Sequence, residues 1–348
     1  MVLCKTKYHI FHSILRNFLI IDCKSIYNSN NKFDPKKEKI GFHKQFITVP
    51  SDTLYELELF QETVPFRVMK PTLSTGSKLL MPYEGNPKGV KTVLKSNGEI
   101  VPSVLTQVPK KDSLFIWYRP IKVDSLALSV TKENYNQEFS VKIKPQKNDT
   151  LSFSPKQSST LPLRDKLTIN STRPLSLLKN ELMTVTKKDS TIVPFTTEYD
   201  EMTMELKFDF IKEPAEKYTL KMLPGAITDF YGQSNDSLTY VLSTKNLSDY
   251  GNLRVVLQNV NRFPVILQIV DPKGETVATA YSESTTNIEF NAIEPALYTL
   301  RLIYDDNNNN IWDTGSFMEK RQSEEVIYFP KEIDVRANWD VEQPFSLP

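Results

Sequence analysis

Short β-prone runs, separated by turn signals, repeat along this chain from about residue 45 to its end. Some of them alternate apolar and polar residues with period two, whereas long segments with helical periodicity are scarce. Strands at this spacing with polar turns are typical of antiparallel sandwiches. The sequence therefore predicts an all-β chain of tandem antiparallel β-sandwiches. The strands are expected at 55–60, 114–118, 126–130, 139–143, 204–208, 218–222, 240–242, 253–257, 265–270, 288–290, 298–304 and 326–329.

The segment 175–184 is the place where the pattern leaves two interpretations open. It follows Pro174, and proline suits the first position of a helix, so a short helix is one expectation. An irregular connection between strands is the other.

Composition excludes several classes of protein. The net charge is +1, from 43 basic and 42 acidic residues, which argues against a nucleic-acid partner. No run approaches the ~20 apolar residues that a transmembrane segment needs. The only cysteines are Cys4 and Cys23, and the last histidine is His43. Catalytic triads and His-ligated metals are therefore nearly excluded beyond residue 43, and we expect no enzyme.

The N-terminal segment, residues 1–44, does not match the rest of the chain. Its stretch 10–21 is apolar but is interrupted by His12, Arg16 and Asn17, and it lacks a cleavage site of the signal-peptide type. We expect that this segment is not the native leader of the mature domains but a truncated or misread start. A short helix or tail and a degenerate export signal are the alternatives.

Three further units follow from the strand pattern and the turns. An Ig-like sandwich is expected at 45–145, and a second Ig-like domain at 150–245 follows a polar linker that begins at Pro145. A C-terminal sandwich is expected at 247–348. Its first hairpin turns at Asp271-Pro272-Lys273-Gly274, where proline presets φ and glycine tolerates a positive φ.

Two of these units resemble known domains. The second carries a late stretch, Leu223, Pro224, Gly225, Ala226, Ile227, Asp229 and Gly232, and with it resembles the S-layer type of bacterial Ig-like domain. The third resembles a transthyretin-like or Cna-B-like sandwich through its segments 295–302, 304–307, 312–315, 326–333 and 336–340.

Together, residues 45–348 resemble the Ig-like domain-containing envelope lipoproteins of the Bacteroidota. The resemblance implies an exported protein of the cell envelope, outer-membrane-associated or periplasmic. Members usually begin with a lipobox cysteine and a further Ig-like domain, so we expect the chain to be a C-terminal portion. Another departure is Ala296, which stands where the usual turn has glycine.

The strongest local chemical signal is the run of aspartates and asparagines after residue 304. Ca²⁺ needs several oxygen ligands at once, and loops of this kind supply them at positions 1, 3, 5, 7 and 9. Asn310 stands at position 6, where glycine is usual and asparagine tolerates the left-handed conformation. The sequence therefore predicts a Ca²⁺ site formed by Asp305, Asn307, Asn309, the carbonyl of Ile311 and Asp313.

Two alternatives to this site stay open. A frame shifted by one uses Asp306, Asn308 and Asn310 but places Thr314 at position 9, and so recruits fewer carboxylates. A metal-free polar turn is equally compatible, because asparagine and aspartate are turn formers. In the preferred frame the twelfth position is Ser316, so the usual bidentate glutamate is missing.

Two functions are compatible with these features. The first is a non-enzymatic cell-envelope protein whose Ig-like domains act as a structural spacer or as docking modules for other envelope proteins. The second is a carbohydrate-binding module, with surface glycans as partners and Trp312 or Trp339 as stacking platforms, although tryptophans are more often core residues. The sequence leaves the oligomeric state open.

Overall fold

The computed structural model describes residues 8–15, 18–25, 33–43, 47–48, 57–144, 147 and 149–348, and of β1, β2 and β4 it describes the backbone only. The described residues contain no α-helix, and the chain divides into two compact units. Unit 1 comprises residues 1–64 and 248–348, and unit 2 comprises residues 65–247. No helix in the described part is long and apolar enough to cross a membrane.

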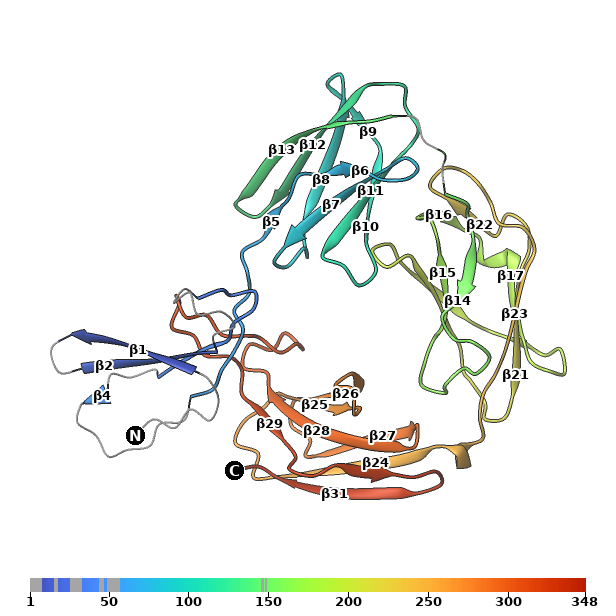
Figure 1. The fold of residues 1–348 in the computed structure, drawn as a ribbon. Helices are drawn as coiled ribbons and strands as arrows, with labels where there is room; N and C mark the ends of the chain where they lie inside the picture. The colour runs from blue at the N-terminus through green and yellow to red at the C-terminus, as the bar shows by residue number, and fades with distance from the viewer. Residues whose placement is uncertain are drawn as a thin grey trace. The chain divides into compact units, whose positions relative to one another are not determined.

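Unit 2 begins with a sandwich of two antiparallel sheets (Figure 1). Along β12, Leu126, Leu128 and Val130 are buried while the residues between them are more exposed, so the period-two pattern selects the core face. One sheet has the order β10 (Ser103–Gln107), β11 (Ser113–Tyr118), β7 (Lys78–Glu84) and β5 (Arg67–Val68), with β6 (Thr72–Leu73) also on β7. The other has the order β13 (Tyr135–Lys142), β12 (Ser125–Lys132), β8 (Lys91–Ser96) and β9 (Glu99–Val101).

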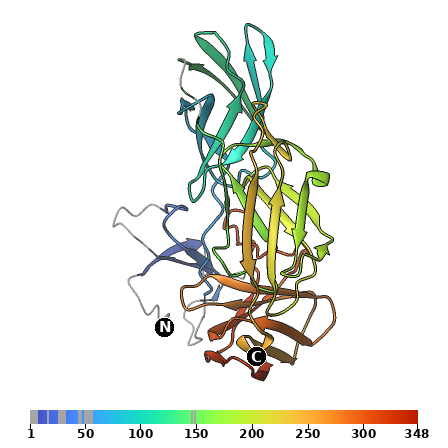
Figure 2. The same ribbon diagram turned by 90° about the vertical axis from the view of Figure 1, so that its right-hand side faces the viewer.

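The second sandwich of unit 2 encloses a core that includes Phe208, Tyr218 and Leu220. Its long strands, green to yellow in Figure 2, run side by side. One sheet has the order β14 (Phe153–Pro155), β15 (Leu167–Ser171), β20 (Glu205–Asp209) and β19 (Thr196–Asp200). The opposite sheet has the order β18 (Ile192–Val193), β17 (Met183–Thr186), β21 (Lys217–Met222) and β23 (Leu238–Ser243), and β16 (Leu175–Leu178) pairs separately with β22 (Ile227–Asp229).

The C-terminal sandwich of unit 1 packs around Phe290, Leu302 and Tyr304, all fully buried. Its strand β31 lies parallel to β24, whereas the other strand pairs of this sandwich are antiparallel. One sheet has the order β27 (Asn287–Ile293), β24 (Gly251–Gln258) and β31 (Asp340–Ser346). The other has the order β26 (Thr276–Ser282), β25 (Val265–Val270), β28 (Ala296–Tyr304) and β29 (Val326–Tyr328), with β30 (Ile333–Val335) also on β28.

The N-terminal part of unit 1 adds a small sheet and a segment that packs on the C-terminal sandwich. Strands β1 (Tyr8–Leu15), β2 (Phe18–Ser25), β3 (Ile40–Phe42) and β4 (Ile47–Thr48) form that sheet. Phe60 is bridged to Ile40 by two backbone hydrogen bonds of 2.8 and 2.9 Å. These residues form a small apolar cluster with Phe42 and Phe317, which ties the N-terminal segment to residues after β28.

The all-β prediction is confirmed, and most expected runs are strands. The turn at Asp271 also forms, with the Gly274 N–H donating to the Asp271 carbonyl and φ of 87° at Gly274. The strand predicted at 55–60 is wrong for its described residues, because residues 57–59 are not strand and Phe60 makes an isolated bridge. Residues 55 and 56 lie outside the described part.

Two other expectations need correction. The segment 175–184 is neither a helix nor an irregular connection, since β16 and β17 flank a short 3-10 turn at Asn180–Leu182. The N-terminal helix alternative is wrong as well where the segment is described, because β1 pairs antiparallel with β2 from Tyr8 and Ser25 to Leu15 and Phe18. The linker from Pro145 lies mostly outside the described residues, and the three domain ranges stay a prediction.

Candidate functional site

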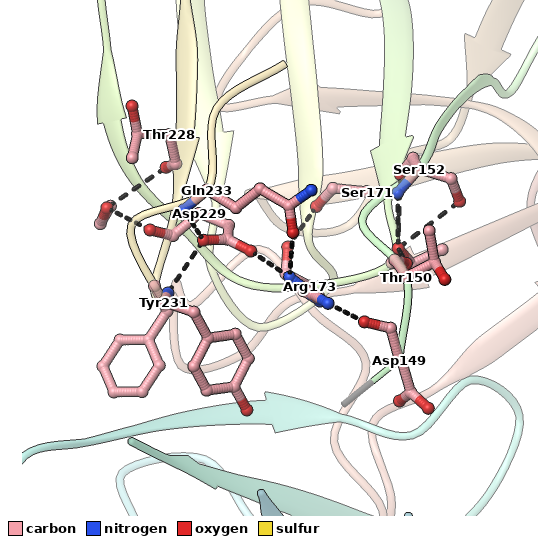
Figure 3. Close-up of polar contacts among 12 residues, drawn as sticks. Asp149, Thr150, Ser152, Ser171, Arg173, Thr228, Asp229, Tyr231 and Gln233 are labelled. Atoms are coloured by element: carbon pink, nitrogen blue, oxygen red, sulfur yellow. Dashed lines mark hydrogen bonds and ion pairs between the residues drawn. The ribbon is translucent and has the colours of Figure 1, made fainter. Parts of the chain in front are cut away.

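A buried ion pair lies at one end of the second sandwich (Figure 3). Arg173 lies in the bend between β15 and β16, and its Nη1 lies 2.7 Å from Oδ2 of Asp229 at the end of β22. The side chains are 7 % and 0 % exposed. Charges removed from water are costly unless they are paired and hydrogen-bonded, so each partner depends on the other.

The second oxygen of Asp229 organises the turn that follows β22. Its Oδ1 accepts the backbone N–H groups of Tyr231 at 2.9 Å and Gln233 at 2.7 Å. Gly232, at the tip of this turn, has a φ of 88°, which glycine adopts without steric cost. The Gln233 side chain returns to Arg173, whose Nη1 donates to Oε1 at 2.9 Å. Arginine, carboxylate and turn thus form one closed network.

The same turn presents Phe230 and Tyr231 to the first sandwich of unit 2. Phe230 packs in a buried cluster with Trp117 of β11 and Met204, and we call this cluster the seam. The Tyr231 hydroxyl donates to the Ser77 carbonyl at 3.1 Å, and the Trp117 and Tyr231 ring centroids lie 6.5 Å apart. Burial raises the pKa of the Tyr231 phenol, against the opposing effect of the Arg173 charge.

Two cations complete the seam. Lys78 of β7 is 7 % exposed, and its Nζ lies 4.4 Å from the Trp117 ring centroid and pairs with the Asp149 carboxylate. Arg173 donates through Nη2 to the Asp149 carbonyl and lies 5.3 Å from the Tyr231 ring centroid. Figure 3 shows Asp149 and Asp229 on opposite sides of the Arg173 guanidinium. Asp149, where the chain enters the second sandwich, thus contacts both sandwiches.

The hydrogen-bonded network of Arg173 and Asp229 includes part of the late motif of the second unit. The late stretch of the second unit contained Asp229, Phe230 and Tyr231, but nothing in the pattern assigned them a partner. Arg173 and Lys78 were missed, because a lone basic residue in a β-rich run carries no local signal. Their partners Asp229 and Asp149 lie 56 and 71 residues away along the chain.

The predicted calcium loop lies in unit 1, after β28. Asp305 is fully buried, and its carboxylate accepts the N–H groups of Asn309 at 3.1 Å and Asn310 at 2.8 Å. The amide groups of Asn307 and Asn309 both donate to Oδ2 of Asp313, at 2.5 and 2.6 Å. Four of the predicted side chains are therefore gathered in one hydrogen-bonded loop.

The backbone angles of the loop and the partners of its side chains describe its conformation. Asn310 has a φ of 65°, the left-handed conformation expected at position 6. The Asp306 side chain turns outward to Arg262, whose Nε lies 2.8 Å from Oδ1. For Ile311 the structure records its N–H, which donates to Oδ1 of Asn309 at 2.9 Å. Metal binding by this loop stays a prediction.

Sequence reasoning missed a third carboxylate beside this loop. Glu324 is 7 % exposed, and its two oxygens accept the N–H groups of Asp306 and Asp313, each at 2.9 Å. Burial raises the pKa of Glu324, and the charges of Asp313 and Asp305 act in the same direction. Among the described residues, no three His, Cys, Asp or Glu side chains converge as a metal centre, so a cation here needs amide and carbonyl oxygens as well.

Comparison with known proteins gives no family. No family model and no curated protein matches the chain. Among solved structures, the major pilin subunit BcpA of Bacillus cereus is 11% identical at a TM-score of 0.21, covering 74% of this chain and 94% of that one. A pair of tandem Ig domains of titin is 13% identical at a TM-score of 0.20, covering 52% and 96%.

A third solved structure is the protein SGBP-B of a Bacteroides ovatus mixed-linkage glucan utilization locus, in complex with a mixed-linkage heptasaccharide. It is 11% identical at a TM-score of 0.20, covering 84% of this chain and 86% of that one. These TM-scores are too low for the likeness to carry weight. The fold class therefore rests on the observed sheets and cores.

Proposed function

We propose that this chain is a non-enzymatic cell-envelope protein whose tandem sandwiches act as a structural spacer or protein-docking module. The observation that carries the proposal is the seam of unit 2. Two successive sandwiches share a buried aromatic cluster, and ionic contacts cross the point where the chain passes between them. Inter-domain motion is the default when such contacts are few and polar, so a buried seam favours a stiff pair.

A stiff pair of sandwiches suits a spacer because it keeps a fixed distance between the partners bound at its two ends. Polar contacts reinforce the apolar cluster of the seam: the Gln107 N–H donates to the Met202 carbonyl at 2.7 Å, and the Tyr231 hydroxyl to Ser77. Each contact joins the first sandwich of unit 2 to the second. The rotation of one sandwich against the other requires that all of them break together.

The spacer function is tested by measuring the stiffness of unit 2 in the full chain. Cys4 and Cys23 are replaced by serine, and spin labels are attached through Ile100→Cys and Ile211→Cys, at side chains that are 72% and 86% exposed. We expect a narrow distribution of label distances by pulsed electron paramagnetic resonance, which broadens in Trp117→Ala. A broad distribution in the unmutated seam would refute the spacer.

A control pair of labels distinguishes seam motion from label motion. Ile192→Cys and Ile211→Cys both lie in the second sandwich, at side chains that are 68% and 86% exposed. Their distance distribution reports the labels and that one sandwich, so it should stay unchanged in Trp117→Ala. If both pairs broaden equally, the substitution has disturbed the second sandwich itself and not the seam alone, and Tyr231→Phe, which removes one hydroxyl, takes its place.

The envelope location is supported by the sequence resemblance of residues 45–348. Fractionation of native cells tests it. We expect the protein in the envelope fractions, and recovery of the full-length protein in the cytosol alone would refute the location.

We also propose that the loop from Asp305 to Asp313 binds Ca²⁺. The support is the donor set, with carboxylates at Asp305 and Asp313 and amide oxygens at Asn307 and Asn309, which are the hard ligands that Ca²⁺ prefers. When bound, the ion would supply positive charge to a loop that carries the carboxylates of Asp305 and Asp313 and is hydrogen-bonded through its backbone to Glu324. Rotation of the two amides would present their oxygens in place of their N–H groups.

A further inference from the structure

A groove of about 690 Å³ runs over the outer face of the C-terminal sandwich in unit 1. Gln268, Arg301 and Tyr328 form a row of cross-strand neighbours on β25, β28 and β29, which points away from the core residues Leu267 and Leu302. The segment 58–62 forms the facing wall. The groove is therefore a cleft between a rigid sheet and a strap of chain.

The strap is held in place by specific contacts. The Thr314 hydroxyl donates to the Gln61 carbonyl at 2.6 Å, and the Phe317 N–H donates to the Glu62 carboxylate. Phe60 is 2 % exposed and packs against Phe42 and Phe317. The wall is thus preformed, which is the usual condition of small-ligand sites.

Two exposed aromatic rings line the groove. Trp312 is 43% exposed, and its Nε1 donates to the Glu324 carbonyl at 3.1 Å, so the indole is anchored at one edge. Tyr328 is 57% exposed at the end of β29. Large aromatic side chains are normally buried, so a pair left open in one cleft points to a ligand with flat apolar faces.

The polar side chains of the groove are arranged for a neutral, hydroxyl-rich ligand. Arg301 donates through Nε to Oε1 of Gln268 at 2.7 Å and through Nη2 to Oγ1 of Thr276 at 3.1 Å. The guanidinium is thus fixed, and its Nη1 remains as a donor beside the Gln268 amide. Lys39 and Arg301 contribute two positive charges, and Glu58 and Glu62 contribute two negative ones, so the lining carries no net charge. A polyanion gains no net attraction from such a lining.

An extended peptide fits this groove less well. It would need to add to the edge strand β29, which comprises three residues, Val326–Tyr328, and offers a short row of backbone groups. Sugar rings need no such strand. Their C–H faces stack on aromatic rings while their hydroxyls pair with guanidinium, amide and carboxylate groups.

We propose that this groove binds a neutral oligosaccharide, stacked on Trp312 and Tyr328 and oriented by Arg301 and Gln268. The groove lies in unit 1 and the seam in unit 2, so this binding stands or falls separately from the spacer function.

The test is titration of the full chain with neutral hexasaccharides, namely cellohexaose, xylohexaose and mannohexaose, followed by calorimetry. We expect at least one to bind, and Trp312→Ala to weaken its affinity about tenfold or more, a loss of about 1.4 kcal/mol. Trp339→Ala is the matched control, because Trp339 is 55% exposed in the same unit but outside the groove. Its affinity should stay within twofold of the unmutated chain.

Second variants keep the test decisive if Trp312→Ala fails to fold, as judged by circular dichroism and thermal melting. Tyr328→Ala and Arg301→Lys should then each lower the affinity. Lysine lacks the planar group that holds Gln268 and Thr276 while presenting a further donor to the ligand. Absence of binding to all three sugars would overturn the proposal. So would equal binding by all groove variants, or binding of an acidic oligosaccharide or a peptide in place of the neutral sugars.

Discussion

Arg173 and Asp229 lie 56 positions apart in the chain, yet their Nη1 and Oδ2 atoms lie 2.7 Å apart in a site that excludes nearly all solvent. This ion pair connects the turn after β22 with the residue at which the chain enters the second sandwich. Through its second oxygen Asp229 shapes the turn that carries Phe230 and Tyr231, and through Nη2 Arg173 holds the carbonyl of Asp149. The ion pair inside the second sandwich therefore also positions the turn and the residue that contact the first sandwich.

Breaking this pair should destabilise the second sandwich strongly. We expect Asp229→Ala to cost about 3–5 kcal/mol, because Arg173 is left as a buried charge without its partner. The measurement is hydrogen exchange of β21 amides in urea, which reports this sandwich within a chain of several domains. Glu198→Ala is the control, since its pair with Lys166 is exposed and should change stability by less than about 1 kcal/mol. Equal effects of the two substitutions would contradict the assignment.

The seam should also weaken at alkaline pH. Burial raises the pKa of Tyr231, so the folded state holds its phenolic proton more tightly than the unfolded chain, whose tyrosines ionise near pH 10. This contribution is complete below about pH 10 and is lost as the pH rises further toward the folded-state pKa. Tyr231→Phe has no proton to lose and should show a smaller drop in melting temperature between pH 9 and pH 11.

The control for the alkaline effect is Tyr328→Phe, at a tyrosine that is 57% exposed. Its melting temperature should fall with pH as much as that of the unmutated chain. If the two variants behave alike, the alkaline loss arises from other tyrosines and lysines.

Calcium binding by the loop predicts a shift in stability. A ligand that binds only the folded state stabilises it by RT ln(1 + [L]/Kd), about 2.7 kcal/mol at a hundredfold excess over Kd. Millimolar Ca²⁺ should therefore raise the melting transition of unit 1 in the full chain, and chelator should reverse it. Mg²⁺ should substitute poorly because it requires a tighter octahedron.

Two matched substitutions separate the two frames of the loop. Asp313→Ala should abolish the Ca²⁺ shift, because it removes a carboxylate that the amides of Asn307 and Asn309 already face. Asp306→Ala should retain it, because that side chain pairs with Arg262 instead. Identical melting with Ca²⁺ and with chelator would make the loop an ordinary polar turn.

Close packing of Gly315 on Phe60 should couple the strap to the sandwich. A Cβ at position 315 would lie 2.6 Å from the ring of Phe60, closer than real Cβ contacts. We expect Gly315→Ala to cost about 1–3 kcal/mol by overpacking and Phe60→Ala about 3–5 kcal/mol by loss of a buried ring. In the double variant the alanine has room, so the summed cost should exceed the measured one in thermal unfolding. Additive costs would show that the two residues act independently.

Sequence alone determined most of the local structure. Residues 126–130 are mostly apolar with small residues at alternate positions, and the larger side chains are the buried ones. The proline and glycine of the turn at Asp271 predicted a hairpin turn, which forms. Asn310 was assigned a left-handed position, and it has one. These features depend on backbone preferences and on neighbours a few residues away, so a linear pattern contains them.

The tertiary structure alone decided the sites. Arg173 pairs with Asp229, and Lys78 pairs with Asp149. Glu324 accepts the N–H of Asp313, 11 residues earlier in the chain. None of these contacts produces a periodic pattern in the sequence. The groove likewise needs the strap at 58–62 to fold over β28, across more than two hundred residues of chain. Such contacts form only when the sheets pack together and long loops close. The free energy of that packing comes from many residues, so no single segment of the sequence predicts the contacts.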